Sequence, residues 1–352
     1  VYNASPSAGG AGEMSRFMTQ LLVESPLVVT HHSMDFNLQS RQIFPQAIAK
    51  PVAWAEGMRR FSPSAINEYM RCQLLFFYNR VAKIKAPQKQ AVIIEPNVLG
   101  SVFHKTAELF YLDFVEHGNP VITPARLAPF LEPAADASLV FYVRRAMAEE
   151  QVGENVLVEQ IVKSFFKQLL RNDSKLETFK IKGLETPRAL TFNVLVNGAV
   201  RQVELCGIID RMDIVSDPTI NDGAETLRIV DYKTNGSMEQ ALSMDALFTP
   251  GEKHPHYVLQ TFLYALMVAP DVNNMPLMPT LFFVNKYGDK NFLPYIKYAN
   301  EPLTDFAPLA QDFKFRLEKL LSEMLDEATP FKPTSVLQRC ENCNYRLLCY
   351  GK

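Results

Sequence analysis

The sequence predicts a mixed α/β domain built around one central sheet. Apolar residues recur at helical spacing in the first and last parts of the chain, and from about residue 188 the pattern changes to alternation. The Asn197-Gly198 pair lies between two alternating runs and is typical of the tight turn of a hairpin. Helices before and after a run of strands indicate one sheet with helices packed on it.

Helical spacing predicts four helices before the sheet. The first begins near Ser64, behind a serine and a proline that are typical of a helix start. The second carries His104 near its start and ends at Gly118, because glycine readily adopts the conformation that closes a helix. The last two form a helical insertion near 120–175. The expected ranges are 62–81, 98–118, 124–149 and 154–171.

The second half of the chain predicts three strands in a meander, followed by helices and further strands. The first two strands flank the Asn197-Gly198 turn, and the third is short and buried. An apolar helix, two more strands and a long amphipathic helix complete the domain. The ranges, in chain order, are 189–196, 199–215, 227–234, 256–269, 281–288, 291–299 and 303–328.

Composition excludes several classes of protein. With 352 residues and 47% hydrophobic residues, the chain is neither disordered nor a disulfide-stapled miniprotein. The formal charge of -2 provides no global attraction to nucleic acid, so DNA binding must use a local patch. There is no run of about 18 apolar residues and no signal-peptide pattern, so we expect a soluble, cytoplasmic protein without a membrane partner. The start at Val1 suggests an excised fragment, with 1–50 as a tail or linker and 51–352 as the domain.

Two acidic residues and a lysine are placed for metal-dependent chemistry. Asp231 and Lys233 are one residue apart in a predicted strand, so both project from one face and Tyr232 projects from the other. Asp210 ends the preceding strand, and a hairpin-like return brings it beside Asp231. Two convergent carboxylates suit Mg²⁺ or Mn²⁺, which would polarise a scissile phosphate while Lys233 orients water or steadies charge. The alternative interpretation of the Asp-x-Lys pair is a surface ion pair.

Four short segments give the sequence a family resemblance. GSVFH (100–104), GIIDR (207–211), DYKT (231–234) and QTFLY (260–264), in this order, resemble the RecB-like branch of the PD-(D/E)XK nuclease superfamily. The resemblance spans roughly 60–352. It implies a restriction-endonuclease-like core, in which a central mixed β-sheet is flanked by helices, plus the helical insertion.

The resemblance also implies roles for individual residues. In this family a helix histidine, an aspartate, an Asp/Glu-x-Lys pair and a Gln-x-x-x-Tyr helix surround the metal ion. Lys233 is then the catalytic lysine, and Gln260 and Tyr264, which share a helix face, contact the DNA backbone and support the active site. The implied metal ligands are His104, Asp210, Asp231 and the backbone carbonyl of Tyr232.

Other polar residues near this set have less specific interpretations. Glu108 and Glu185 could support the metal ligands or simply be solvated. Asp213 falls on the opposite strand face from Asp210, outside the metal shell. A histidine pair, 254 and 256, has no further nitrogen or sulfur ligand nearby in sequence, so we interpret it as loop histidines near the DNA groove.

Three cysteines near the end of the chain predict a second metal centre. Cys340, Cys343 and Cys349 are separated by two and five residues and need a fourth ligand. Cys206 lies inside a strand, where it packs as a small hydrophobic residue, so Cys72 is the preferred fourth ligand. Four thiolates can hold zinc or a [4Fe-4S] cluster, and spacing alone does not decide between them.

The cysteine arrangement resembles the iron-sulfur staple of AddB-type nuclease domains and, more loosely, that of CRISPR-associated RecB-like nucleases. The resemblance favours a [4Fe-4S] cluster over zinc. Joining Cys72 to Cys340 closes a loop of about 268 residues. Such closure contributes roughly 5 to 6 kcal/mol at most, so the cluster is expected to be structural.

The first 26 residues carry a weaker resemblance, to the end of a superfamily 1 helicase-like region; the alternative is a linker with one amphipathic helix. No Gly-x-x-x-x-Gly-Lys-Ser/Thr loop occurs, so ATP hydrolysis is not expected. Together the resemblances imply an Mg²⁺- or Mn²⁺-dependent deoxyribonuclease that cuts single-stranded DNA delivered by an AddA-like helicase subunit during double-strand-break repair. The alternatives are a non-catalytic DNA-binding scaffold and a stand-alone CRISPR-associated-type RecB-like nuclease.

Overall fold

A computed structural model describes residues 15–26, 44–52, 54–85, 96–153, 155–285 and 295–350. The chain divides into two compact units, 1–43 and 44–352. In the first unit one helix is described, α1 (Arg16–Glu24), which buries no side chain. The rest of the expected tail up to residue 43, apart from the residues flanking this helix, lies outside the described residues. Within the described ranges, no helix combines the length and apolarity needed to span a membrane.

The second unit has a mixed α/β fold, as the sequence predicts. A six-stranded sheet has the order β2-β3-β4-β5-β7, and β1 pairs with β4. Antiparallel pairs join β2 to β3, β3 to β4 and β4 to β5, whereas β5 pairs with β7 and β1 with β4 in parallel. The strands are β1 (Arg59–Phe61), β2 (Val121–Ile122), β3 (Thr178–Val196), β4 (Ala199–Ser216), β5 (Thr226–Lys233) and β7 (Leu277–Phe283).

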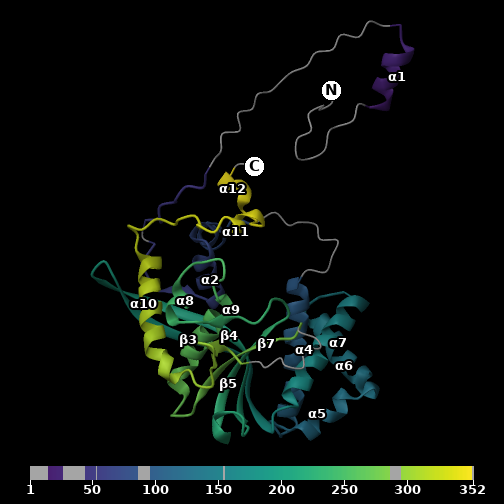
Figure 1. The fold of residues 1–352 in the computed structure, drawn as a ribbon, viewed down its shortest axis with the longest axis vertical. Helices are drawn as coiled ribbons and strands as arrows, with labels where there is room; N and C mark the ends of the chain where they lie inside the picture. Colours follow the sequence, from purple (N-terminus) through teal and green to yellow (C-terminus); the bar gives the residue numbers. More distant parts are fainter. Residues whose placement is uncertain are drawn as a thin grey trace. The chain divides into compact units, whose positions relative to one another are not determined.

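Helices cover the sheet, and Figure 1 shows α4–α7 gathered on one side of it and α10 on the other. The α2 start is fixed by Ser62, whose side chain accepts a hydrogen bond from the Ala65 amide, with Pro63 as the first helical residue. The main helices are α2 (Pro63–Arg71), α3 (Gln73–Phe76), α4 (Pro96–Glu116), α5 (Pro124–Leu131), α6 (Asp136–Glu149), α7 (Val156–Asp173), α8 (Met244–Phe248), α9 (His256–Val268) and α10 (Ala310–Leu325). Short helices α11 (Gln338–Glu341) and α12 (Arg346–Tyr350) follow.

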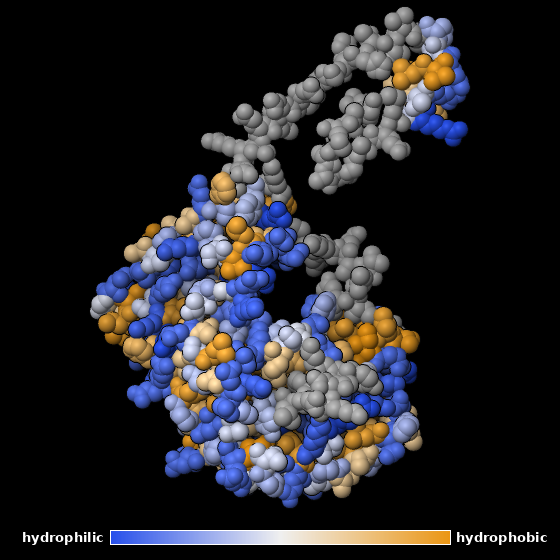
Figure 2. All heavy atoms as spheres, viewed as in Figure 1, coloured by the Kyte–Doolittle hydropathy of each residue, from blue (hydrophilic) through white to orange (hydrophobic). Residues whose placement is uncertain are grey.

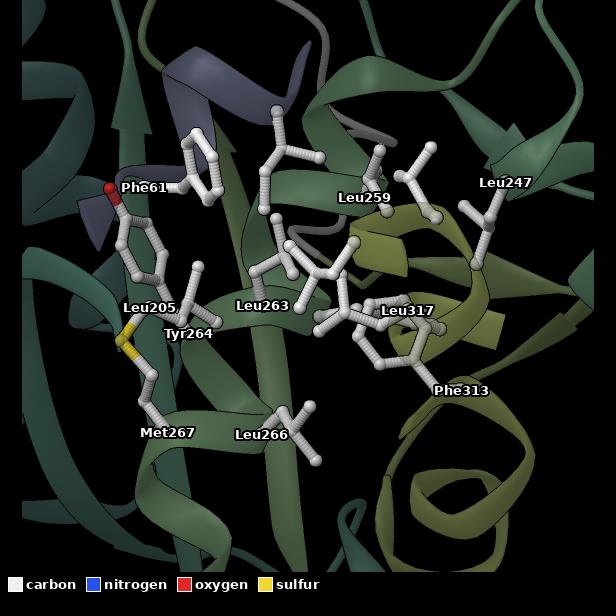
Figure 3. Close-up of a cluster of buried hydrophobic side chains, with 14 of the residues drawn as sticks. Phe61, Leu205, Leu247, Leu259, Leu263, Tyr264, Leu266, Met267, Phe313 and Leu317 are labelled. Atoms are coloured by element: carbon white, nitrogen blue, oxygen red, sulfur yellow. The ribbon is translucent and has the colours of Figure 1, made fainter. Parts of the chain in front are cut away.

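Two hydrophobic core clusters are formed. In the first core cluster, side chains of α9 such as Leu259 and Leu263 meet Phe313 and Leu317 of α10, with Phe61 of β1 close by (Figure 3). The second core cluster joins α4, α6 and α7 to β4, β5 and β7. On the surface seen in Figure 2, polar and hydrophobic side chains are interspersed. The sheet is thus packed on both faces, which fixes the strands that carry the polar residues described below.

The long hairpin β3–β4 agrees with the predicted turn. Asn197 and Gly198 both have positive φ, 49° and 80°, as a two-residue hairpin turn of this kind requires. The register continues from the turn to Gly183 opposite Met212, and a bulge follows before Ile181. This hairpin therefore sets which residues of β3 and β4 face each other at its far end.

Several predicted elements differ in extent. The helix expected over 62–81 is interrupted at Cys72, whose backbone is extended (φ -168°, ψ 119°), and it ends as a π-helix, Phe77–Val81. The helix expected over 124–149 is interrupted at Pro133, because proline cannot continue the helix before it. The strand expected over 281–288 begins earlier, at Leu277, and 286–294 lie outside the described residues. Of the strand expected over 291–299, two residues form β8 (Lys297–Tyr298), in a small sheet with β6 (Gln240–Ala241) and β9 (Glu301–Pro302).

Candidate active site

The candidate site lies where β4 leaves β5. Residues 211–215 of β4 pair with β5, while 203–205 pair with β1 on the same strand. Between these two pairings, β4 carries Asp210, and the end of β5 carries Asp231 and Lys233. At this fork Asp210 and Asp231 are buried, whereas the neighbouring His104 and Glu185 side chains are partly exposed, so a substrate can approach from the side of His104 and Glu185.

Asp231 and Lys233 share one face, and the Lys233 ammonium lies 2.6 Å from Asp231 Oδ2. Burial raises the pKa of Asp231 to about 6, although Lys233 acts in the opposite direction. Burial alone would lower the pKa of Lys233, but Asp231 and then Asp210 hold that pKa above its usual value. The lysine is therefore charged at neutral pH and is fixed beside a buried carboxylate.

Asp210 is held by the backbone of β5. Its Oδ2 accepts a hydrogen bond from the Tyr232 amide at 2.7 Å. Burial alone would raise the pKa of Asp210, but the facing His104 lowers it below the usual range. The Tyr232 ring points to the other face, into the second core cluster, where it contacts Phe103. Tyr232 thus binds Asp210 through its backbone, while its ring packs edge-on against the His104 ring, with centres 5.8 Å apart.

His104 and Glu185 complete a group that could hold a metal ion. The ligand atoms of His104, Glu185 and Asp210 all lie within 4.8 Å of one another. His104 Nδ1 is 3.3 Å from Asp210 Oδ1 and 3.8 Å from Glu185 Oε1. Burial opposes the charged imidazolium, but Asp210 and Glu185 outweigh burial and raise the pKa of His104 to about 10. One nitrogen and two carboxylates are a suitable donor set for Mn²⁺ or Mg²⁺.

Glu185 belongs to this group, although the sequence analysis treated it only as a supporting or solvated residue. The register of the predicted hairpin could have placed it there. Leu184 pairs with Arg211 and Thr186 with Ile209, so Glu185 is opposite Asp210. Counting back from the two-residue turn gives the same pairing. Glu185 has φ of 41°, a strained conformation for a residue other than glycine, and such strain concentrates at functional sites.

Gln260 and Tyr264 lie on α9 and support Asp231. The Gln260 side-chain amide donates to Asp231 Oδ1 at 3.2 Å and lies 3.2 Å from the Tyr264 hydroxyl. Gly207 makes this arrangement possible, because a Cβ at that position would lie 2.9 Å from the Tyr264 ring. The glycine of the GIIDR segment therefore provides space for Tyr264, which is 8% exposed.

Asp213 is not part of the His104–Glu185–Asp210 group. It forms ion pairs with Arg211 (2.9 Å) and Arg228 (2.8 Å), and Arg211 also pairs with Asp173 at 2.7 Å. All four side chains are buried behind β4 and β5. This buried ion network satisfies its own charges and is structural.

The two histidines after residue 250 have partners of their own. His254 Nε2 contacts the Leu247 carbonyl at 2.8 Å, and His256 Nδ1 lies 2.8 Å from Glu239 Oε1. His256 is the first residue of α9, where the helix expected over 256–269 was predicted to begin, so of the two histidines interpreted as loop residues only His254 lies outside a helix. The Glu108 carboxylate forms an ion pair with the Lys105 ammonium, one turn away on the same helix, at 2.9 Å. This contact is an ordinary one for the surface of a helix.

The four cysteines of the expected second centre line one cavity, together with Tyr78 and Tyr345. Burial raises the pKa of the Cys349 thiol, and the nearby thiols raise it further. Contacts between distant segments bring the cysteines together: Tyr345 donates to the Ile84 carbonyl at 2.7 Å, and Arg339 donates to the Arg71 carbonyl at 3.2 Å. Cys206 lines a different surface hollow, with Arg60 and Arg188. The cavity cysteines are Cys72, Cys340, Cys343 and Cys349.

Comparisons with known proteins add to this geometry. The family model described as the PD-(D/E)XK nuclease superfamily matches residues 60–350. A comparison with curated proteins gives no match. Among solved structures, one titled "Crystal structure of SSO0001" matches with 15% sequence identity and a TM-score of 0.26, and the match covers 73% of this chain and 97% of that one.

Proposed function

Because the chain belongs to the PD-(D/E)XK nuclease superfamily, we propose that it hydrolyses phosphodiester bonds of DNA at the His104–Asp210–Asp231 site and that the hydrolysis depends on a divalent cation. The observation that carries this proposal is that His104, Glu185 and Asp210 gather at the fork between β4 and β5, with the Asp231–Lys233 pair on the adjoining end of β5. Members of the superfamily are nucleases, so the site is assigned a reaction of that class.

The donor set of His104, Glu185 and Asp210 fits a hard divalent cation. Asp231 lies outside that group and pairs with Lys233, and we propose it as an additional ligand. Bound there, Mg²⁺ or Mn²⁺ supplies positive charge that polarises the scissile phosphate. The backbone carbonyl of Tyr232 remains a proposed further ligand. Glu185 is added to the ligands expected from the sequence because its carboxylate lies within the same group.

The other side chains bind and orient. Lys233 would direct the attacking water with its ammonium and stabilise the charge that grows on the phosphate. Asp231 holds that ammonium at 2.6 Å, so its position is set before the substrate arrives. The Gln260 amide hydrogen-bonds the Asp231 carboxylate and lies within hydrogen-bonding distance of the Tyr264 hydroxyl. We propose that Gln260 and Tyr264 also contact the DNA backbone.

A narrower proposal concerns the substrate and the partner. We infer that the substrate is single-stranded DNA delivered by an AddA-like helicase subunit in double-strand-break repair. Its support is the resemblance of segments 100–104, 207–211, 231–234 and 260–264 to RecB-like nucleases. A stand-alone nuclease would cleave the same strands without a helicase.

A [4Fe-4S] cluster is the proposed occupant of the cysteine cavity. Its support is that Cys72, Cys340, Cys343 and Cys349 line one cavity and that their spacing in the sequence resembles the iron-sulfur staple of AddB-type nuclease domains. Zinc is the alternative occupant, because four thiolates bind either group.

Nuclease assays with matched variants test the proposed activity. We expect cleavage of labelled single-stranded DNA with Mg²⁺ or Mn²⁺ and none with a chelator, and we expect Asp231→Ala and Lys233→Ala each to lower the rate at least about 100-fold. Asp312→Ala and Lys314→Ala are controls, because these residues form the same Asp-x-Lys pattern on the exposed surface of α10. Wild-type rates in either site variant would disprove the assignment, and a wild-type protein that binds DNA without cleaving it would indicate a scaffold. Duplexes with 5′ or 3′ single-stranded tails test the strand preference.

A further inference from the structure

Tyr257, near the start of α9, covers the lysine of the candidate site. The Lys233 ammonium lies over the Tyr257 ring, 5.3 Å from its centre. On a helix, residues 257, 260 and 264 share one face, so Tyr257 extends the row formed by Gln260 and Tyr264. The lysine therefore has the Asp231 carboxylate on one side and an aromatic face on another.

The position of the Tyr257 ring is fixed by contacts on several sides. The His256 ring lies against it with centres 4.0 Å apart, and the Phe283 ring lies edge-on at 5.5 Å. Gly236 has φ of 96°, and a Cβ there would lie 3.0 Å from the tyrosine ring, so the loop after β5 presses closely on the ring. A ring held in this way does not need to reorganise to meet the ammonium.

The backbone of Tyr257 is fixed as well. Its amide donates to Glu239 Oε2 at 2.8 Å, and the other oxygen of the same carboxylate lies 2.8 Å from His256 Nδ1. A carboxylate at the start of a helix is favourable there because it satisfies a free amide and complements the helix dipole. Glu239 thus anchors the first turn of α9 beside the site.

We propose that Tyr257 is a positioning residue for Lys233, which holds the ammonium in place through a cation–π contact and excludes water from one side of it. This inference rests on the proposed nuclease function. An ammonium that is partly removed from water gains more from an aromatic face than an exposed one does. The contact acts on the orientation of Lys233 and not on DNA binding, so its loss lowers kcat and leaves KM unchanged.

A graded series of ring substitutions tests the proposal in the full chain. Replacing Tyr257 by phenylalanine keeps the ring face, so kcat should stay within about twofold of wild type. Phenylalanine carrying one, two or three ring fluorines keeps the shape of the side chain but weakens its attraction for a cation, so kcat should fall stepwise. Tyr257→Leu should lower kcat about tenfold on a single-stranded oligonucleotide, with KM unchanged. Tyr298→Leu is the matched control, because this half-buried tyrosine contacts α9 at Phe262, on the other side of the helix.

The outcomes separate the two proposals. Equal kcat across the fluorinated series, a rise in KM at constant kcat, or the same loss in Tyr257→Phe as in Tyr257→Leu would each overturn the positioning role while wild-type cleavage remains. A wild-type protein that does not cleave DNA would overturn the proposed function itself. The fluorinated variants keep the side-chain volume, so they decide the question even if Tyr257→Leu does not fold.

Discussion

Glu185 has a backbone conformation that is unfavourable for glutamate, and the surrounding structure holds it there. Its φ of 41° is unfavourable for a residue with a Cβ, and its carboxylate faces the imidazole of His104 and lies opposite Asp210 in the hairpin. Strain of this kind costs about 1 to 3 kcal/mol and persists only where the surrounding structure imposes it. Here the flanking pairs, Leu184 with Arg211 and Thr186 with Ile209, hold Glu185 within the hairpin.

Glu185→Gln should weaken binding of Mn²⁺ by at least about tenfold, because it removes one negative charge from the ligand group while keeping the shape of the side chain. Calorimetric titration of the metal-free protein measures the affinity. Glu225→Gln, at an exposed position before β5, controls for the loss of a carboxylate. Unchanged affinity in Glu185→Gln would remove Glu185 from the proposed ligands.

At the scale of elements, α7 and the hairpin are joined by charge as well as by apolar packing. The last residue of α7, Asp173, is 1% exposed and accepts two hydrogen bonds from Arg211, at 2.7 and 3.0 Å. Arg211 directly follows Asp210 in β4. The helical insertion therefore helps to fix the strand that carries a proposed metal ligand.

Asp173→Asn should lower the free energy of unfolding by about 3 to 5 kcal/mol at pH 7, because it leaves the buried Arg211 without its full counter-charge. Burial alone would raise the pKa of Asp173, but Arg211 holds it below the usual value. The carboxylate therefore adds stability above its unfolded pKa of about 4, and this stability is lost as the pH falls through the lower folded pKa. Urea titrations should accordingly show the difference from wild type shrinking toward pH 2. Asp136→Asn, on the exposed surface of α6, should have little effect, and equal curves for both variants would contradict the role given to Asp173.

At the scale of the whole domain, the cysteine cavity joins residues near both ends of the described second unit. If the proposed cluster is present, wild-type protein purified without oxygen should contain iron and absorb broadly at about 400 nm, and Cys72→Ala should lose both. Cys206→Ala should retain both, because Cys206 lines a different hollow. Loss of the long closed loop should also lower stability, by roughly 5 to 6 kcal/mol at most. Iron that remains in Cys72→Ala, or zinc in the wild-type protein, would contradict the proposed cluster.

The sequence predicted the mixed α/β fold and the placement of Asp231 and Lys233, because both depend on periodicity and on one clear turn. It did not predict the break at Cys72, since the apolar spacing continues through that residue. In the structure, the Arg71 carbonyl beside the break accepts a hydrogen bond from Arg339 of the C-terminal segment, a contact that local pattern does not determine. Tyr257 was not singled out, because its relation to Lys233 depends on how α9 packs on β5, which local pattern does not determine. Glu185 could have been found from the hairpin register alone.

The proposed metal site lies between the two core clusters, so metal binding should affect how the domain unfolds. His104 belongs to a helix packed in the second core cluster, whereas Asp231 is fixed by α9 of the first. A cation that binds only when both layers are in place would stabilise that joint state by mass action, by an amount that grows with the logarithm of its concentration over its dissociation constant. The proposed ion would thereby link the two layers into one cooperative unit. In a chelator, the layer formed by α4–α7 can open with less cost to the rest of the domain, and amide hydrogen exchange in that layer would report the difference.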